Sequence, residues 1–196
     1  GDLARLYIKL KKFDDASRIL KQSHDNAEGS SVPDMIAHVN LLLLVAEVKQ
    51  GMNNSEGALG DLLAARGVQQ DILARTRSSD DANAQEQRLE AAKLDYRIGN
   101  HHLDNNNVGD AVKFFKNALE HDNSYEVAML GLAKLYLKQG ELQKCQHQCG
   151  LLMRIDENHE EAAMMLADIM FQKRENEQAV YHFKQILQRK PNNHKA

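Results

Sequence analysis

The sequence predicts an all-α fold in which antiparallel pairs of helices stack into a superhelix. The first observation is a period of 34 residues in the second half of the chain, where Leu132 aligns with Leu166 and Cys145 with Ala179. Each period holds two amphipathic segments with helical spacing, separated by a polar turn. The composition agrees, because 42% hydrophobic and 27% charged residues suit helices with one buried face, and the chain has only two prolines.

About ten helices follow from this pattern, taken in chain order. They are expected over residues 2–10, 13–23, 33–50, 55–77, 84–104, 108–121, 125–139, 142–155, 159–173 and 176–189. Pro33 suits a first helical turn, where its missing N–H is not needed. Gly51 and Gly140 suit the left-handed conformation that ends a helix. Asn54 or Ser55, and later Asn158, are expected to cap the helices that follow them.

The second repeat is irregular. Leu43 and Ile98 are 55 residues apart, where one period would be 34, and the additional residues keep helical spacing. The pattern therefore predicts one lengthened helix pair, at 55–77 and 84–104. We expect a partial repeat at 1–32, an irregular extended repeat at 33–91, regular repeats at 92–125, 126–159 and 160–193, and the start of a further repeat at 194–196. Both ends fall within a repeat, so we expect a piece of a longer solenoid.

The period also predicts the core. Small residues of each first helix should lie where paired helices approach most closely, and larger residues of the second helix should fill the space before the next hairpin. The predicted core residues are Gly99, Ala111, Phe115, Ala118, Ala133, Cys145, Cys149, Leu152, Ala167, Ala179 and Phe183.

Charge and composition exclude several functions. A net charge of −3 with no basic stripe argues against nucleic-acid binding and against an anionic membrane surface. The longest strongly apolar run, Leu41–Ala46, is too short for a membrane span, so no membrane insertion is expected. Two cysteines form no disulfide framework, which favours a reducing, intracellular location.

Three clusters of reactive side chains fall short of a catalytic or metal site. Cys145 and Cys149 are four residues apart, but no second ligand pair follows at zinc spacing. The helix that begins at His159 has Ala163 where a metalloprotease needs its second histidine. His101 and His102 are adjacent and face different ways on a helix. We therefore expect no enzyme activity, metal, cofactor or small-molecule substrate.

Residues that bind a partner are expected on the first helix of each repeat, facing the concave side of the superhelix. Their apolar members suggest that a helix or another solenoid lies in the groove. A groove for acidic C-terminal peptides should carry Lys and Asn around one carboxylate, but Gly131 and Met165 stand at those positions. A solvated face without a partner remains the alternative. The predicted interaction residues are Lys93, Tyr96, Arg97, Asn100, Leu103, Val127, Leu130, Lys134, Leu137, Lys138, Glu161, Met164, Met165, Asp168 and Phe171.

The regular repeats resemble tetratricopeptide repeats (TPRs), which implies a TPR-type α–α superhelix, a right-handed solenoid. Three stretches, at 57–75, 97–122 and 144–193, are similar to a narrower family. They closely resemble the C-terminal half of the large TPR subunit of intraflagellar transport complex A, the tetratricopeptide repeat protein twenty-one family. The spacing around the lengthened helices, Cys145-x-x-x-Cys149 and the run from Met164 to Phe171 are the most distinctive parts. The chain departs from the TPR pattern at Asn123 and Glu157, where proline often ends the unit.

This resemblance implies a non-catalytic scaffold in retrograde intraflagellar transport and in the delivery of membrane cargo into cilia. The implied location is the cilium or flagellum and the basal body, on the cytoplasmic side and associated with the cytoskeleton. The implied partners are the other subunits of intraflagellar transport complex A. Two alternatives remain open from the residues alone: a free-standing peptide-binding adaptor similar to a chaperone cofactor, and a regulatory helical domain attached to an enzyme.

Overall fold

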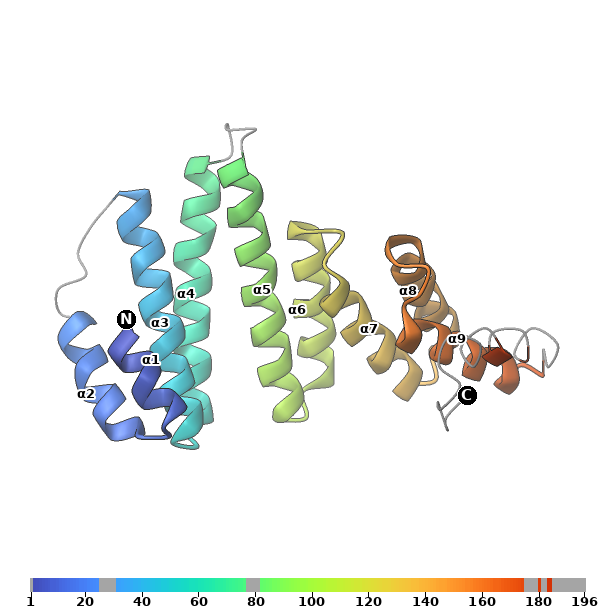
Figure 1. Ribbon diagram of the computed structural model, residues 1–196, viewed down its shortest axis with the longest axis horizontal. Coiled ribbons are helices and arrows are strands. Elements are labelled where there is room, and N and C mark those ends of the chain that lie inside the picture. The colour runs from blue at the N-terminus through green and yellow to red at the C-terminus, as the bar shows by residue number, and fades with distance from the viewer. Residues whose placement is uncertain (1, 25–30, 77–81, 175–179, 181–182, 185–196) are drawn as a thin grey trace. The chain divides into compact units, whose positions relative to one another are not determined.

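The computed structural model describes residues 2–24, 31–76, 82–174, 180, 183 and 184, of which the side chains of 2 and 21–24 are not described. Within these residues the chain forms nine α-helices and no strand, so the all-α prediction is confirmed (Figure 1). Most of the predicted helix 176–189 lies outside the described residues. The helices are α1 (Asp2–Lys9), α2 (Phe13–His24), α3 (Val32–Gly51), α4 (Ser55–Thr76), α5 (Ala82–Asp104), α6 (Val108–His121), α7 (Glu126–Lys138), α8 (Leu142–Ile155) and α9 (Glu160–Gln172).

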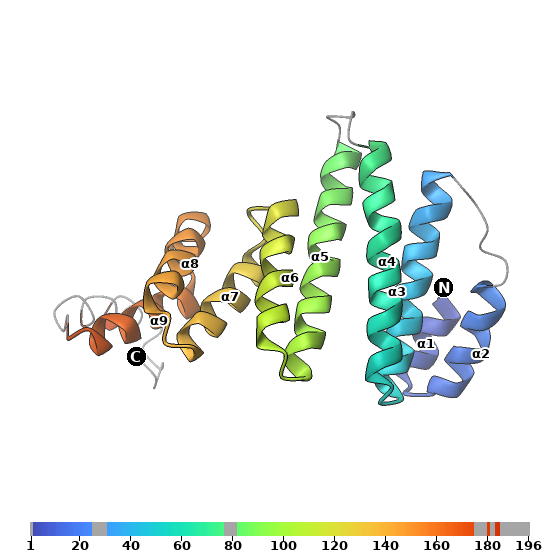
Figure 2. The same cartoon turned by 180° about the vertical axis from the view of Figure 1, so that it is seen from behind.

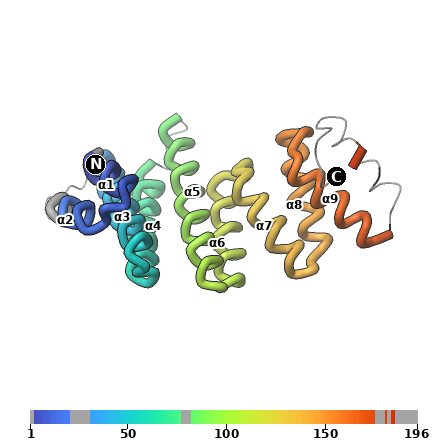
Figure 3. The backbone as a smooth tube through the Cα atoms, turned by 60° about the horizontal axis from the view of Figure 1, so that its bottom comes forward, coloured from blue at the N-terminus to red at the C-terminus, as the bar shows by residue number. Residues whose placement is uncertain are grey.

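The helices belong to two compact units that divide after Asp122. The first unit contains α1–α6, and in it each helix packs against the next one in sequence, as seen from both sides (Figures 1 and 2). α1 also contacts α3, which is the contact expected between the first helices of neighbouring repeats. The second unit contains α7–α9, in which α8 contacts both other helices (Figure 3).

α3 is buried on two sides. Its residues Leu44 and Val48 pack with Ala4, Ala16 and other apolar residues of α1 and α2. Its residues Val39, Leu42 and Ala46 join a second cluster with side chains of α4 and α5. A helix that contributes to two apolar clusters needs hydrophobic residues around most of its circumference, which explains the Leu41–Ala46 run noted in the sequence.

Pairs of small buried residues, twelve apart in sequence, mark the hairpins. The pairs in the described chain are Ala4 with Ala16, Ala46 with Ala58, Gly99 with Ala111, and Ala133 with Cys145. Ala46 and Gly99 are 53 residues apart, 19 more than one period. The lengthened pair, α4 with 22 residues and α5 with 23, is confirmed, and α3 is long as well with 20.

The predicted role of Gly51 is wrong. Gly51 belongs to α3, and the left-handed residue after the helix is Asn53, with a φ of 59°. A Cβ at Gly51 would lie 2.3 Å from the ring of Phe13, so this position is restricted by the close approach of α2. Gly140 does adopt the left-handed conformation after α7, with a φ of 72°, as predicted.

The caps agree in part with the sequence. Pro33 lies in the first turn of α3, as expected, and Ser31, which was not predicted, caps that helix. The side chain of Asn54 accepts a hydrogen bond of 2.9 Å from the backbone N–H of Gly57. The predicted cap Asn158 is wrong, because His159 takes that position and its Nδ1 accepts the N–H of Ala162 at 3.2 Å.

Candidate protein-interaction site

Most of the predicted core residues are buried where helices pack against each other. Gly99 shows why a small residue is needed, since a Cβ there would lie 2.5 Å from Cε1 of Phe115, which is fully buried. Phe183 is half-buried, and Ala179 lies outside the described residues. The predicted core residues that the structure buries are Gly99, Ala111, Phe115, Ala118, Ala133, Cys145, Cys149, Leu152 and Ala167.

The predicted interaction residues of the first unit all lie on α5. Lys93 is exposed, whereas Tyr96, Arg97, Asn100 and Leu103 are half-buried. Tyr96 stacks on Phe115 with 5.2 Å between ring centroids, so part of this side chain supports the core. Lys93 and Arg97 are the members of this set that line a groove.

This groove, named here the α3–α5 groove, has a volume of about 370 Å³. Its apolar lining consists of Ile36, Val39 and Leu43 from α3 and Leu94 from α5. The polar lining comes from Asn40 on α3, Gln69 on α4, and Glu86, Gln87, Glu90, Lys93 and Arg97 on α5. The lining is therefore mixed, and it offers apolar contact, hydrogen bonds and charges in one groove.

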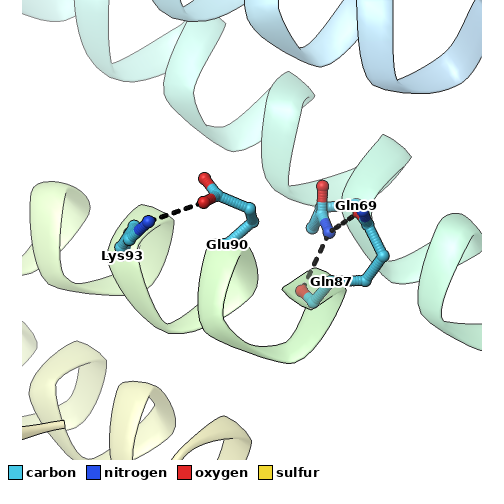
Figure 4. Close-up of polar contacts among 4 residues, drawn as sticks. All are labelled: Gln69, Gln87, Glu90 and Lys93. Carbon is cyan, nitrogen blue, oxygen red and sulfur yellow. Dashed lines mark hydrogen bonds and ion pairs between the residues drawn. The ribbon is translucent and has the colours of Figure 1, made fainter. Parts of the chain in front are cut away.

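Two buried amides form the polar floor of the groove. Gln69 and Gln87 are only 3% and 4% exposed. Nε2 of Gln69 donates hydrogen bonds to the backbone oxygen and to Oε1 of Gln87, both at 3.1 Å (Figure 4). At the rim, Lys93 forms an ion pair of 2.6 Å with Glu90. The amide pair fixes α4 against α5 at the base of the groove.

A charged network that the sequence did not indicate lies elsewhere in the first unit. The carboxylate of Asp95 is 1% exposed and lies between Arg66 Nε at 2.5 Å and His121 Nε2 at 3.3 Å. The guanidinium of Arg66 also lies over the ring of Phe114, 5.5 Å from its centroid. Because a buried carboxylate needs polar or cationic partners, these contacts tie α4, α5 and α6 together. An aspartate on the otherwise apolar face of α5, between Leu94 and Ile98, was the available signal.

The two adjacent histidines do face different ways, with ring planes 84° apart. His101 is buried, with Nδ1 3.3 Å from Gln50 Nε2 and Nε2 3.2 Å from Ser55 Oγ. Burial, and then the charge of His102, lower the pKa of His101, against a smaller opposite effect of Asp104. This histidine thus acts as a neutral link between α3, α4 and α5.

The predicted interaction residues of the second unit lie on α7 and α9. Met165 is a correction: it is 7% exposed, because it lies on the same face of α9 as its buried neighbours Ala162 and Ile169. Lys134 and Glu161 form an ion pair of 2.6 Å between the two helices. The half-buried members are Leu130, Leu137 and Met164, and the exposed members are Val127, Lys134, Lys138, Glu161, Asp168 and Phe171.

The two cysteines lie in the interior of the second unit. Both are fully buried, with sulfurs 4.0 Å apart. The hydrogen bond with Cys145, and then burial, raise the pKa of the Cys149 thiol. In the part of the chain that the structure describes, no three His, Cys, Asp or Glu side chains gather as metal ligands. None of the helices in that part combines the length and the apolar composition that a membrane span requires.

Comparison with models of known protein families shows to which family the chain belongs. Residues 1–119, more than half of it, match the family model described as "Tetratricopeptide repeat protein 21 forth ARM domain". The chain belongs to the tetratricopeptide repeat protein 21 family. Residues 160–196 match the model described as "TT21 fifth ARM repeats domain", and residues 102–169 match a general tetratricopeptide repeat model. The resemblance found in the sequence is therefore confirmed.

Relatives within the tetratricopeptide repeat protein 21 family align with nearly the whole chain. It is 35% identical over 193 residues to "Tetratricopeptide repeat protein 21A" of Mus musculus, and 33% identical over 193 residues to "Tetratricopeptide repeat protein 21B" of Xenopus laevis. Each alignment covers 98% of this chain. The chain spans only 15% and 14% of the length of these two relatives.

Solved structures with a similar fold are helical repeat proteins. The crystal structure of MamA superposes with a TM-score of 0.71 at 17% identity, covering 100% of this chain and 99% of that one. YrrB, described as a TPR protein with an unusual peptide-binding site, superposes with a TM-score of 0.65 at 12% identity, covering 99% and 86%. At these identities the similarity shows the TPR fold alone.

Proposed function

We propose that this chain is a segment of a non-catalytic scaffold subunit of intraflagellar transport complex A, acting in retrograde ciliary transport and in the delivery of cargo to cilia. The observation that carries this proposal is membership of the tetratricopeptide repeat protein 21 family, with 35% identity to a relative over 98% of the chain. The corresponding location is the cilium or flagellum and the basal body, on the cytoplasmic side. The partners are other protein subunits of that complex, with no nucleic acid, membrane insertion, cofactor or small-molecule substrate.

The proposed mechanism is to hold partner surfaces in fixed relative positions. The first-helix residues supply two kinds of contact: apolar area for burial, such as Val127 and Phe171, and charges such as Lys93 and Arg97. In protein interfaces a buried apolar centre supplies most of the affinity, while the polar rim fixes orientation. The buried ion pair of Asp95 with Arg66 holds α5, which carries Lys93 and Arg97, against α4.

Co-purification tests the proposal. The full-length parent protein, tagged in ciliated cells, should retain the other subunits of the complex, and a version with Val127→Asp and Phe171→Asp should retain them less. Both side chains are exposed, so these changes leave the core intact. The matched control carries Arg154→Ala in α8 and Glu157→Ala in the turn after it, because both side chains are exposed. Failure of the unaltered full-length protein to retain any subunit of the complex would reject the assignment.

A peptide-binding adaptor is the second candidate. The observation in its favour is the α3–α5 groove, which combines apolar walls with buried amides. A convergent carboxylate-binding pocket would distinguish this adaptor from a scaffold, and binding of peptides with a free acidic C-terminus would measure it. The same peptides with an amidated C-terminus are the control. We expect no difference between the two forms.

A further inference from the structure

The floor of the α3–α5 groove has hydrogen-bonding capacity that the folded chain does not use. Gln69 Oε1 and Gln87 Nε2 make no hydrogen bond within the described residues, yet neither atom is sealed from solvent. The oxygen of Gln69 points away from Gln87 (Figure 4). The floor therefore presents one acceptor and one donor close together, from side chains that are more than nine-tenths buried. A peptide group, with one N–H and one C=O, is the complement of this pair.

The rim of the groove carries an ordered set of charges along α5. Glu86, Glu90, Lys93 and Arg97 follow one another at helical spacing on the face that lines the groove. The inner two neutralise each other through their ion pair. No ion pair within the described residues engages Glu86 or Arg97. The groove thus has an acidic end near the start of α5 and a basic end farther along.

The separation of these two charges can be worked out from helix geometry. Eleven residues divide Glu86 from Arg97, and at 1.5 Å per residue this is about 16 Å, or three turns. An extended chain rises by about 3.3 Å per residue, so it covers that length in about five residues. In a helix the backbone N–H and C=O groups are already hydrogen-bonded within the helix, whereas an extended chain leaves them free to pair with other groups. The unused acceptor of Gln69 and donor of Gln87 therefore suit the extended chain better.

We propose that the α3–α5 groove binds an extended segment of a partner polypeptide. A peptide group of that segment pairs with Gln69 and Gln87, and its apolar side chains contact the walls. A basic side chain meets Glu86, and an acidic side chain meets Arg97, about five residues away. This inference adds a binding mode to the proposed scaffold function. It rests on that function in one respect, that the ligand is a protein.

A series of synthetic peptides tests this geometry. Each labelled peptide alternates Val and Ser and carries one Lys and one Glu, separated by two to about twelve positions and in both orders along the chain. Fluorescence anisotropy with the complete 196-residue chain measures the affinities. One order should bind best at a separation of about five residues, and N-methylation of the central peptide groups should weaken it about tenfold, equivalent to 1.4 kcal/mol. A maximum near eleven residues would show a helical ligand and overturn the proposal.

Variants of the protein provide the sharper test. Exchange of the end charges, Glu86→Arg with Arg97→Glu, should reverse which order of Lys and Glu binds better. Gln87→Glu keeps an acceptor for Gln69 but removes the outward donor, so it should weaken every peptide about tenfold. Arg88→Gln is the matched control, because this exposed residue of α5 lines a different cavity and should change nothing.

The outcomes separate this inference from the proposed function. Equal affinity for all peptides, or an order preference that survives the charge exchange, would overturn the inference while leaving co-purification with the complex intact. If circular dichroism shows that the exchanged protein has lost its helices, Glu86→Gln and Arg97→Gln decide instead. Each must then reduce the preference for one order of Lys and Glu, and indifference to both substitutions would reject the site.

Discussion

Gly99 should respond to an added methyl group in the opposite way from most helical glycines. Alanine in place of glycine within a helix stabilises a protein by about 0.5–1 kcal/mol, because the unfolded chain loses freedom. At Gly99 the new Cβ would lie 2.5 Å from Cε1 and 2.6 Å from Cδ1 of Phe115. That ring is fully buried and cannot move aside, since Tyr96 stacks on it.

The magnitude follows from comparing the two effects. Overpacking of a filled core costs typically about 1–3 kcal/mol, which exceeds the gain in helix propensity. We therefore expect Gly99→Ala to lower the free energy of unfolding by about 0.5–2 kcal/mol. Gly67 in α4 is the matched control, because nothing lies within 4 Å of a Cβ built there. Gly67→Ala should raise the free energy of unfolding by about 0.5–1 kcal/mol.

Urea unfolding followed by circular dichroism measures both variants, with unchanged slopes showing that the change is in stability. Phe115→Leu supplies the second side of a double-mutant cycle, because the shorter side chain removes the ring atoms that the new methyl would meet. The penalty of Gly99→Ala should shrink by about 1 kcal/mol or more in that background. The reasoning fails if Gly99→Ala stabilises as much as Gly67→Ala, or if its penalty is the same with leucine at position 115.

Three further predictions concern the buried polar groups and the corrected methionine. Asp95→Asn should destabilise the protein by about 1–3 kcal/mol in urea titrations, less than for a sealed ion pair because its partners Arg66 and His121 are about a quarter exposed. Burial lowers the pKa of His101 below 6.5, so as the pH falls the unfolded chain binds a proton before the folded chain does. The free energy of unfolding should therefore decrease as the pH drops below 6.5. His101→Gln should make the free energy of unfolding depend less on pH in this range. Met165→Ala should cost about 2–5 kcal/mol, whereas Phe171→Ala, 65% exposed, should change the urea midpoint little.

The sequence located those packing positions that repeat at the fixed period. Gly99 and Ala133 could be predicted because consecutive regular hairpins place equivalent residues at equivalent contacts. Ala46 was missed because the sequence comparison aligned Leu43, and not Val45, with Ile98 across the lengthened helices. The spacing of twelve residues between Ala46 and Ala58, inside a single hairpin, survives such lengthening, since it depends only on the turn between two helices.

The polar interior was beyond the reach of a hydrophobic pattern. Periodicity assigns Gln69 and Asp95 to the surface because it counts them as polar, although their partners let them be buried. Met165 failed for a related reason: Met164 and Met165 are equally apolar, and only the packing of α9 shows which one faces inward. The α3–α5 groove could be predicted only in part, since Lys93 and Arg97 were found but its α3 wall was not.

The position of α3 between two apolar clusters limits how this protein can be shortened. A truncated form that begins at α3 would keep Val39, Leu42 and Ala46 covered by the following helices. It would uncover Leu44 and Val48, which the first hairpin shields. Such an exposed stripe of apolar side chains favours self-association and precipitation. Expression of pieces of this region should therefore retain α1 and α2, even where the experiment concerns only the later helices.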